Sequence, residues 1–214
     1  MTEFDVALHR ALKKFQSAGS VQVKETPPHG EPADLTVAIA TYDDFDGAYF
    51  TIHSILVHHR EVLDRVEFVL LDNNPEGLPA PMLESFAGYI DRFRYIPFTD
   101  VRSTAVRDVL FRKATGKYVL VLDSHVILAP GSLSALLAYF DADPETDDLI
   151  QGPMLSQDSS HIAATHMDPK WRNGMFGSWG VDSRAKQHPD VPFEIVMQGL
   201  GSFACRREAW PGLN

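Results

Sequence analysis

Between residues 35 and 140, short runs of mostly apolar residues alternate with stretches in which apolar residues recur every three or four positions. Continuous apolar runs are typical of strands buried on both faces, and the longer spacing is typical of helices. The runs predict strands over 35–40, 66–71, 93–97 and 118–122. The spacing predicts helices over 48–59, 81–89, 105–110 and 133–140. Strands that alternate with helices predict an α/β domain with a mostly parallel sheet flanked by helices.

The chain before this pattern has a different character. Residues 4–15 place apolar side chains at helical spacing with charges of both signs opposite, which predicts an amphipathic helix. This helix could pack on its own domain or contact a second copy of the chain in a homo-oligomer. A stretch rich in Gly, Pro, Ser and charge follows and predicts a linker. We therefore expect a helical extension and linker over 1–33 and one domain over 34–214.

The segment from 141 to 192 breaks the alternation of strands and helices. It is polar, rich in Gly, Pro and His, and contains Trp171 and Trp179. Such a composition predicts long loops with short strands, an excursion of the kind that often serves a functional site.

The composition of the chain limits the kinds of partner that it can bind and indicates the cellular compartment. The chain has 214 residues, 44% of them hydrophobic, and a formal net charge of -10. An acidic field repels polyphosphate, so we expect no nucleic-acid partner. The single cysteine, Cys205, excludes an internal disulfide and a multi-cysteine metal site and fits a reducing compartment. No apolar run reaches about 18 residues, so we expect a cytoplasmic chain without a membrane span.

Polar or ionisable residues follow each predicted strand. Ligands of open parallel sheets bind outside the carboxyl ends of the strands, so these residues are candidates for one site. Each cluster alone also fits a turn or a helix cap, but four clusters at one edge favour a site. They are Thr41, Tyr42 and Asp43 after the first strand, Asp72 after the second, Arg107 after the third and Asp123 after the fourth.

The sequence Asp123-Ser124-His125 ends the last of these strands. Residues two apart in an extended chain point the same way, so the carboxylate and the imidazole can converge while Ser124 faces elsewhere. One carboxylate and one imidazole suit Mn²⁺ better than an all-oxygen Mg²⁺ or Ca²⁺ site and leave positions open for phosphate oxygens. A Ser-His-Asp hydrolase is excluded because neighbours on a strand alternate sides. The remaining alternative is a strand-ending turn with a surface histidine.

From Leu35 to the end, the chain resembles the GT-A glycosyltransferases, and most of all family 2 of the nucleotide-sugar-dependent transferases. The matching segments are TVAIATYDD, VLLDNNPEG, STAVRDVLFRKATGKYVLVLDSH and MQGLGSFACRREAW. In the third segment a helix ends in Ala-Thr-Gly, a buried strand follows, and a D-x-D type motif ends the strand. The Asp-Ser-His variant is similar to the form used by polypeptide N-acetylgalactosaminyltransferases.

The resemblance implies a GT-A (Rossmann-like) fold and metal-dependent transfer of a sugar from a nucleoside diphosphate sugar, with a UDP-sugar as the expected donor, to an acceptor hydroxyl. It implies Mn²⁺ as the metal, with Mg²⁺ as the alternative. The implied nucleotide-binding residues are Thr41, Tyr42, Asp43, Asp72 at the base, Arg107, Asp123 and Ser124. The implied metal ligands are Asp123 and His125, and the residues at the donor sugar and acceptor are Gly199, Gly201 and Ser202.

The chain departs from the family in one respect. The family's catalytic base is an acidic residue about twenty positions after the glycine-rich element, and this chain stops at Asn214. We therefore expect a domain that lacks its C-terminal acceptor part. His161, His166 and His188 are conceivable substitutes for missing groups. Two alternatives stay open: a nucleotidyltransferase of similar fold, and a non-catalytic nucleotide-sugar-binding or assembly protein.

Overall fold

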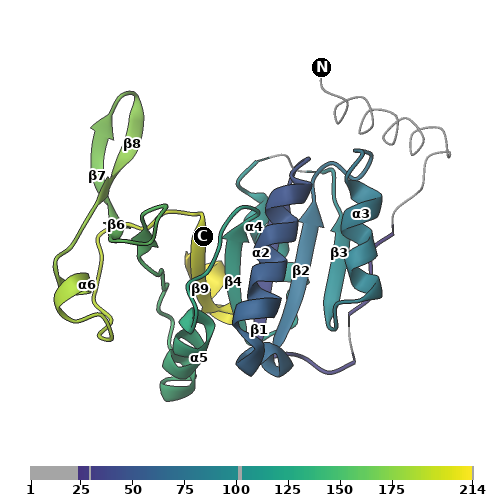
Figure 1. Cartoon of the computed structure of the whole chain (residues 1–214), viewed down its shortest axis with the longest axis horizontal. Coiled ribbons are helices and arrows are strands. Elements are labelled where there is room, and N and C mark those ends of the chain that lie inside the picture. The colour runs from purple at the N-terminus through teal and green to yellow at the C-terminus, as the bar shows by residue number, and fades with distance from the viewer. Residues whose placement is uncertain (1–23, 29, 101–102, 214) are drawn as a thin grey trace.

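The computed structural model describes residues 24–28, 30–100 and 103–213, so the helix expected over residues 4–15 lies outside the described residues. Its main feature is a five-stranded sheet with the order β3-β2-β1-β4-β9 (Figure 1). The first four strands pair in parallel, and β9 pairs antiparallel with β4. Their bounds are β1 Leu35–Thr41, β2 Val66–Asp72, β3 Phe93–Pro97, β4 Tyr118–Asp123 and β9 Ser202–Arg206. The α/β class and the mostly parallel sheet predicted from the sequence are confirmed.

The register aligns the carboxyl ends of the parallel strands. Thr41 of β1 lies opposite Asp72 of β2, and Ala40 lies opposite Asp123 of β4. Asp72 lies opposite Pro97 of β3. The polar clusters that follow these strands therefore meet at one edge of the sheet, as the sequence pattern predicts.

Helices cover both faces of the sheet. One apolar cluster joins β1, β2 and β4 to α2, α3, η2 and α5, and a second cluster on the other face joins the sheet to α4 and Trp210. Helix α2 begins at Phe45, three residues before the expected start, because the Asp44 side chain accepts a hydrogen bond from the Gly47 N–H and caps the helix. The helical bounds are α2 Phe45–His58, η1 Arg60–Arg65, α3 Ala80–Glu84, η2 Ser85–Gly88, α4 Val106–Lys113, α5 Ser132–Ala142, η3 Arg207–Ala209 and α7 Trp210–Leu213.

A buried polar network fixes the turn that leads into β4. The Glu67 carboxylate, 2% exposed, accepts hydrogen bonds from Thr36 Oγ1 and from the Thr115 N–H, both at 2.6 Å. The Gly116 N–H donates to Thr36 Oγ1 at 3.0 Å. A Cβ at Gly116 would lie 2.7 Å from the Thr36 backbone nitrogen, so only glycine fits at this approach. The Ala-Thr-Gly turn therefore sets where β4 starts.

Part of the expected linker lies beside the sheet. The Thr26 N–H donates to the Tyr95 carbonyl of β3 at 2.9 Å. Lys113 Nζ contacts the Glu25 carboxylate at 2.8 Å, and the Lys24 N–H donates to the Glu84 carboxylate at 3.0 Å. Residues 24–26 are thus held beside β3, α3 and α4 by specific bonds.

The excursion predicted over 141–192 forms small strands and one short helix. Its bounds are β5 Met154–Leu155, β6 Ile162–Ala164, β7 His166–Arg172, β8 Met175–Gly180 and α6 Arg184–Gln187. The β7–β8 hairpin projects away from the main sheet, at the left of Figure 1. Among the helices that the structure describes, none combines the length and the apolar character needed to cross a membrane.

Candidate functional site

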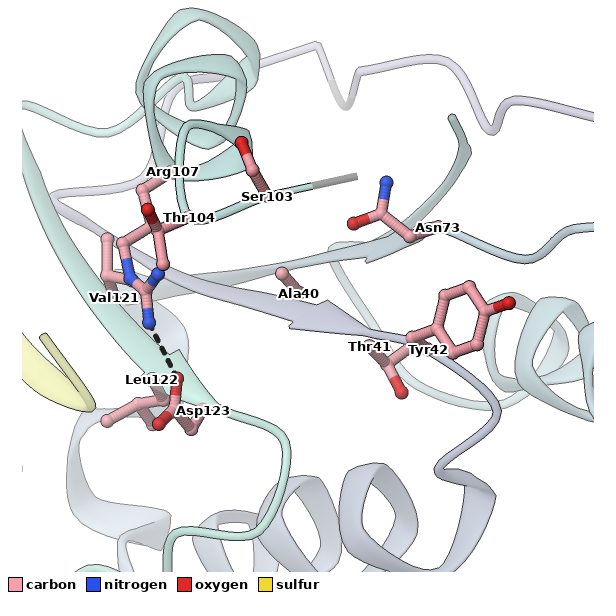
Figure 2. Close-up of a pocket in the computed structure, with 10 residues that line it drawn as sticks. All are labelled: Ala40, Thr41, Tyr42, Asn73, Ser103, Thr104, Arg107, Val121, Leu122 and Asp123. Atoms are coloured by element: carbon pink, nitrogen blue, oxygen red, sulfur yellow. Dashed lines mark hydrogen bonds and ion pairs between the residues drawn. The ribbon is translucent and has the colours of Figure 1, made fainter. Parts of the chain in front are cut away.

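A cavity of about 240 Å³ opens at the carboxyl edge of the sheet, where β1 and β4 end (Figure 2). Backbone groups and side chains from four separate segments line it, which is the ligand position expected for an open parallel sheet. Its lining residues are Ala40, Thr41, Tyr42, Asn73, Ser103, Thr104, Arg107, Val121, Leu122 and Asp123. Four residues predicted from the sequence, Thr41, Tyr42, Arg107 and Asp123, are thus brought together.

The loop after β1 forms one wall of the cavity. Thr41 is 3% exposed and its Oγ1 donates to the Asp44 carbonyl at 3.2 Å. Tyr42 is 54% exposed, so much of its ring faces solvent at the cavity wall. Asp43 has a φ of 53° and accepts a hydrogen bond from Asn74 Nδ2 at 2.8 Å. Asp43 is therefore used to join the two loops and does not line the cavity.

Asp72 and Asn73 face different surroundings at the end of β2. The Asp72 carboxylate is buried and accepts hydrogen bonds from the Tyr95 hydroxyl at 2.7 Å and from the Asn74 N–H at 2.8 Å. Burial raises the pKa of Asp72, and the two hydrogen bonds oppose that rise. Asn73 lines the cavity, and its Nδ2 donates to the Phe98 carbonyl at 3.1 Å. The structure therefore brings Asn73 to the cavity in place of Asp72. Neighbouring side chains of an extended chain point to opposite sides, and this alternation in the sequence could have distinguished the two residues.

Arg107 and Asp123 form an ion pair inside the cavity. Arg107 Nη2 donates to Asp123 Oδ1 at 2.9 Å, as the dashed line in Figure 2 marks. Arg107 Nε donates to the Leu200 carbonyl at 3.1 Å, and the Asp123 N–H donates to the Gly201 carbonyl at 2.8 Å. The ion pair therefore connects α4, the end of β4 and the segment that precedes β9.

Ser124 and His125 turn toward α2. Ser124 is 6% exposed and its hydroxyl donates to Asp44 Oδ2 at 2.5 Å, while Thr51 Oγ1 donates to the Ser124 carbonyl at 2.8 Å. The Ser124 hydrogen bond lowers the pKa of the Asp44 carboxyl, against the opposing effect of burial. His125 Nδ1 lies 3.6 Å from Asp44 Oδ2 and the His125 side chain is 73% exposed. Ser124 thus anchors the loop to α2 and leaves the imidazole open to solvent.

The expectation that Ser124 faces away from Asp123 and His125 is wrong, because the extended chain ends at Asp123 and a turn follows. Ser124 Oγ and His125 Nδ1 both approach Asp44 Oδ2, while Asp123 pairs with Arg107.

The described residues supply two metal donors at this edge. Asp123 and His125 offer a carboxylate and a solvent-accessible imidazole. Within the described part of the chain, no three His, Cys, Asp or Glu side chains come together as a ligand set. A donor set of one oxygen and one nitrogen fits a divalent ion whose other positions are filled by phosphate oxygens and water.

The segment 199–202 borders the same edge and touches the excursion. A Cβ at Gly201 would lie 2.9 Å from Asp123 Oδ2, and one at Gly199 would lie 2.5 Å from the Trp179 ring. The Gly199 N–H donates to Gln151 Oε1 at 2.9 Å, and Ser202 begins β9. Trp179 is 51% exposed. One side of its indole therefore packs on the glycine segment beside the cavity, while the rest stays open.

The histidines proposed as substitutes lie elsewhere. His166 bonds to Thr165 Oγ1 at 2.9 Å and to Asp168 at 3.2 Å on the hairpin. His161 contacts Ser160 in an exposed turn, and His188 follows α6. None of the three lines the cavity.

The parallel sheet, the added antiparallel strand and the polar groups at the carboxyl edge define a protein of the GT-A fold class. The chain belongs to glycosyl transferase family 2, because the model of that family matches residues 36–207. The mannosyltransferase PcManGT from Pyrobaculum calidifontis is similar in fold, with a TM-score of 0.58 at 15% identity over 98% of this chain and 54% of its own. TarS 1-349 from S. aureus has a TM-score of 0.51 at 16% identity over 64% of this chain and 41% of its own.

This chain thus spans about half the length of the solved chains that it matches, or less. A comparison with curated protein sequences finds no match. The chain therefore has the family and the fold of these transferases.

Proposed function

We propose that this chain is a glycosyltransferase that transfers a sugar from a nucleoside diphosphate sugar to an acceptor hydroxyl. The observation that carries the proposal is the cavity at the carboxyl edge, where Tyr42, Asn73, Arg107 and Asp123 converge from four segments. An aromatic ring and an amide match a base, a guanidinium matches the diphosphate, and a carboxylate matches its metal ion.

Each nucleotide group has a proposed partner. The Tyr42 ring stacks on the base, and the Asn73 amide reads its hydrogen-bonding edge, the role that the family resemblance implies for Asp72. Arg107 binds the phosphates because its guanidinium matches them in charge and geometry. Thr41, Asp43 and Ser124 act through the loops that they hold in place.

Asp123 and His125 are the proposed ligands of the divalent ion, with Mn²⁺ favoured over Mg²⁺. Such an ion supplies Lewis-acid stabilisation for the negative charge that develops on the departing nucleoside diphosphate. The structure of PcManGT is that of a complex with GDP-Man and Mn²⁺, which supports a nucleotide sugar and this metal for the fold. A UDP-sugar remains our proposed donor, on the resemblance of the sequence motifs.

The sugar and the acceptor belong on the side of Gly199, Gly201 and Ser202. Trp179 packs on Gly199 and is half exposed, so its free indole surface can stack on a sugar ring. Trp171 lies further along the hairpin, 74% exposed and edge-on to Phe176. We propose Trp179 as the aromatic nearest the transferred sugar.

Calorimetric titration of UDP, GDP and UDP-sugars, with and without Mn²⁺, tests the donor site. We expect a nucleotide to bind in the presence of Mn²⁺ and Asp123→Ala to weaken that binding at least about tenfold, because the metal loses a ligand. Asp143→Ala is the matched control, since Asp143 is an exposed residue that follows α5 and does not line the cavity. If no nucleotide binds to the folded chain, the proposed function is excluded.

A second function, nucleotide-sugar binding without transfer, is favoured by one observation. The residues that line the cavity include a single carboxylate, Asp123, and no histidine. A chain that binds UDP-sugar and neither transfers nor hydrolyses the sugar would support this second function. Release of free sugar into water would instead support a working donor site whose acceptor is missing.

A further inference from the structure

Arg107 is held beside Asp123 by two hydrogen bonds. Its guanidinium donates to Asp123 Oδ1 at 2.9 Å and to the Leu200 carbonyl at 3.1 Å. The Arg107 side chain is 14% exposed and that of Asp123 is 39% exposed. The two hydrogen bonds and the burial of Arg107 therefore keep its positive charge next to the Asp123 carboxylate, which we assign to the metal.

The other oxygen of Asp123 is confined as well. A Cβ at Gly201 would lie 2.9 Å from Oδ2, and the Asp123 N–H donates to the Gly201 carbonyl at 2.8 Å. A cation that approaches Asp123 thus meets a carboxylate that rests on a glycine and already has a guanidinium partner. Two cations that share one carboxylate repel each other in this partly buried place.

We propose, on the basis of the proposed function, that Arg107 is a positioning residue that serves as the built-in counter-ion of Asp123. Without ligand, Arg107 neutralises the carboxylate and disfavours metal binding. A bound diphosphate brings several negative charges into the cavity, and the guanidinium then pairs with phosphate and leaves Asp123 to the metal. Arg107 already lines the cavity, so this exchange of partners is local (Figure 2).

The exchange predicts that metal and nucleotide bind cooperatively. Mn²⁺ alone must compete with Arg107 for Asp123 and therefore binds weakly. When UDP is bound, Arg107 pairs with its phosphates, and Mn²⁺ binds Asp123 without this competition. By linkage, each ligand raises the affinity for the other by the same factor.

The test is a titration of the 214-residue chain with Mn²⁺, with and without UDP, in which free Mn²⁺ is measured by electron paramagnetic resonance. Arg107→Met keeps an unbranched apolar stem and removes the charged guanidinium. We expect it to bind Mn²⁺ alone about tenfold more tightly than wild type and to show a smaller gain from UDP. Arg107→Lys restores the charge and should return the Mn²⁺ affinity toward that of wild type.

Arg112→Met is the matched control. Arg112 is on the same helix, is 76% exposed and pairs with Asp108, so the same loss of charge should leave Mn²⁺ binding unchanged. Combining Asp123→Ala with Arg107→Met should abolish the gain in Mn²⁺ affinity that Arg107→Met produces alone. Circular dichroism and thermal melts of each variant check that it is folded.

The outcomes separate this inference from the proposed function. If wild type binds UDP with Mn²⁺ but folded Arg107→Met gains no Mn²⁺ affinity, the counter-ion role is overturned and the donor site stands. If Arg107→Met gains Mn²⁺ affinity but no variant binds a nucleotide, the counter-ion role is supported and the proposed function fails.

Discussion

Single residues at the ends of the strands divide into those that build the edge and those that face the cavity. Asp72 and Asn73 are neighbours, yet the first is buried on Tyr95 and the second lines the cavity. The same division separates Asp123, which lines the cavity, from Ser124, which bonds to Asp44. Because side chains alternate along an extended chain, adjacent polar residues at a strand end have different roles.

Asn73→Ala is expected to raise the Kd for UDP in the presence of Mn²⁺ by about fivefold to tenfold, the effect of one lost hydrogen bond to the base. Mn²⁺ binding without nucleotide should be unchanged. Asn173→Ala is the control, because Asn173 is exposed in the turn between β7 and β8 and is outside the cavity lining. Equal effects of the two substitutions, measured by calorimetry, would contradict a base-reading role for Asn73.

Among the elements, β4 and the turns at its two ends position the site. Its entry turn is fixed by Glu67, Thr36 and Gly116, and its exit is tied to α2 through Ser124, Asp44 and Thr51. Register between β1 and β4 then places Asp123 opposite Ala40. A shift of β4 by one residue would turn Asp123 away from Arg107, because the period of a strand is two.

Gly116→Ala is expected to lower the free energy of unfolding by about 2 kcal/mol or more, because the new methyl group would press on the Thr36 backbone of β1. Urea denaturation at neutral pH measures the change. Gly88→Ala is the control, since nothing lies within 4 Å of a Cβ built at Gly88. Similar small changes for both variants would show that the entry turn adapts easily.

At the scale of the molecule, the sheet and its helices contain the hydrophobic core, and the segment 141–192 is attached to one side of them. Trp171, Met175, Phe176 and Trp179 of the hairpin are all at least half exposed. A two-stranded hairpin has little stability of its own, so its position depends on contacts such as that between Trp179 and Gly199. The hairpin therefore contacts the side of the site that we propose for the acceptor, and none of its residues lines the cavity.

The stability of the whole domain should fall as the pH drops below about 6.5, in part through His59. His59 is fully buried, and burial lowers its pKa. The unfolded chain then binds a proton that the native state does not, so acid favours unfolding by at most about 1.4 kcal/mol per pH unit for this group. His59→Leu should flatten the dependence between about pH 7.5 and pH 5.5 in urea titrations.

The exposed His188 provides the comparison for this effect. His188→Gln should leave the pH dependence of the free energy of unfolding as it is in wild type. An unchanged slope in His59→Leu would show that the buried imidazole is not responsible. The range from about pH 5.5 to pH 7.5 lies above that in which carboxylates ordinarily titrate, so the two variants compare the contributions of the two histidines.

The sequence by itself determined the four parallel strands, the helices between them and the edge at which polar groups gather, whereas the antiparallel strand β9 was not predicted. The strands and helices follow from the spacing of apolar residues, which is a local property of the chain. The edge follows from the general rule that ligands of open parallel sheets bind at the carboxyl ends of the strands. The sequence also singled out Thr41, Tyr42, Arg107 and Asp123 by their positions after strands, and all four line the cavity. The helix over 81–89 was expected as one element and forms α3 and η2.

Only the tertiary structure decided how these residues pair. The contact of Arg107 with Asp123 joins residues 16 positions apart, and that with Leu200 spans 93. Ser103 and Thr104 of the cavity wall and the approach of Trp179 to Gly199 were likewise not expected. Such contacts depend on strand register and on the packing of an irregular excursion. No spacing along the chain encodes them, because they arise from the simultaneous fit of segments that are distant in the sequence.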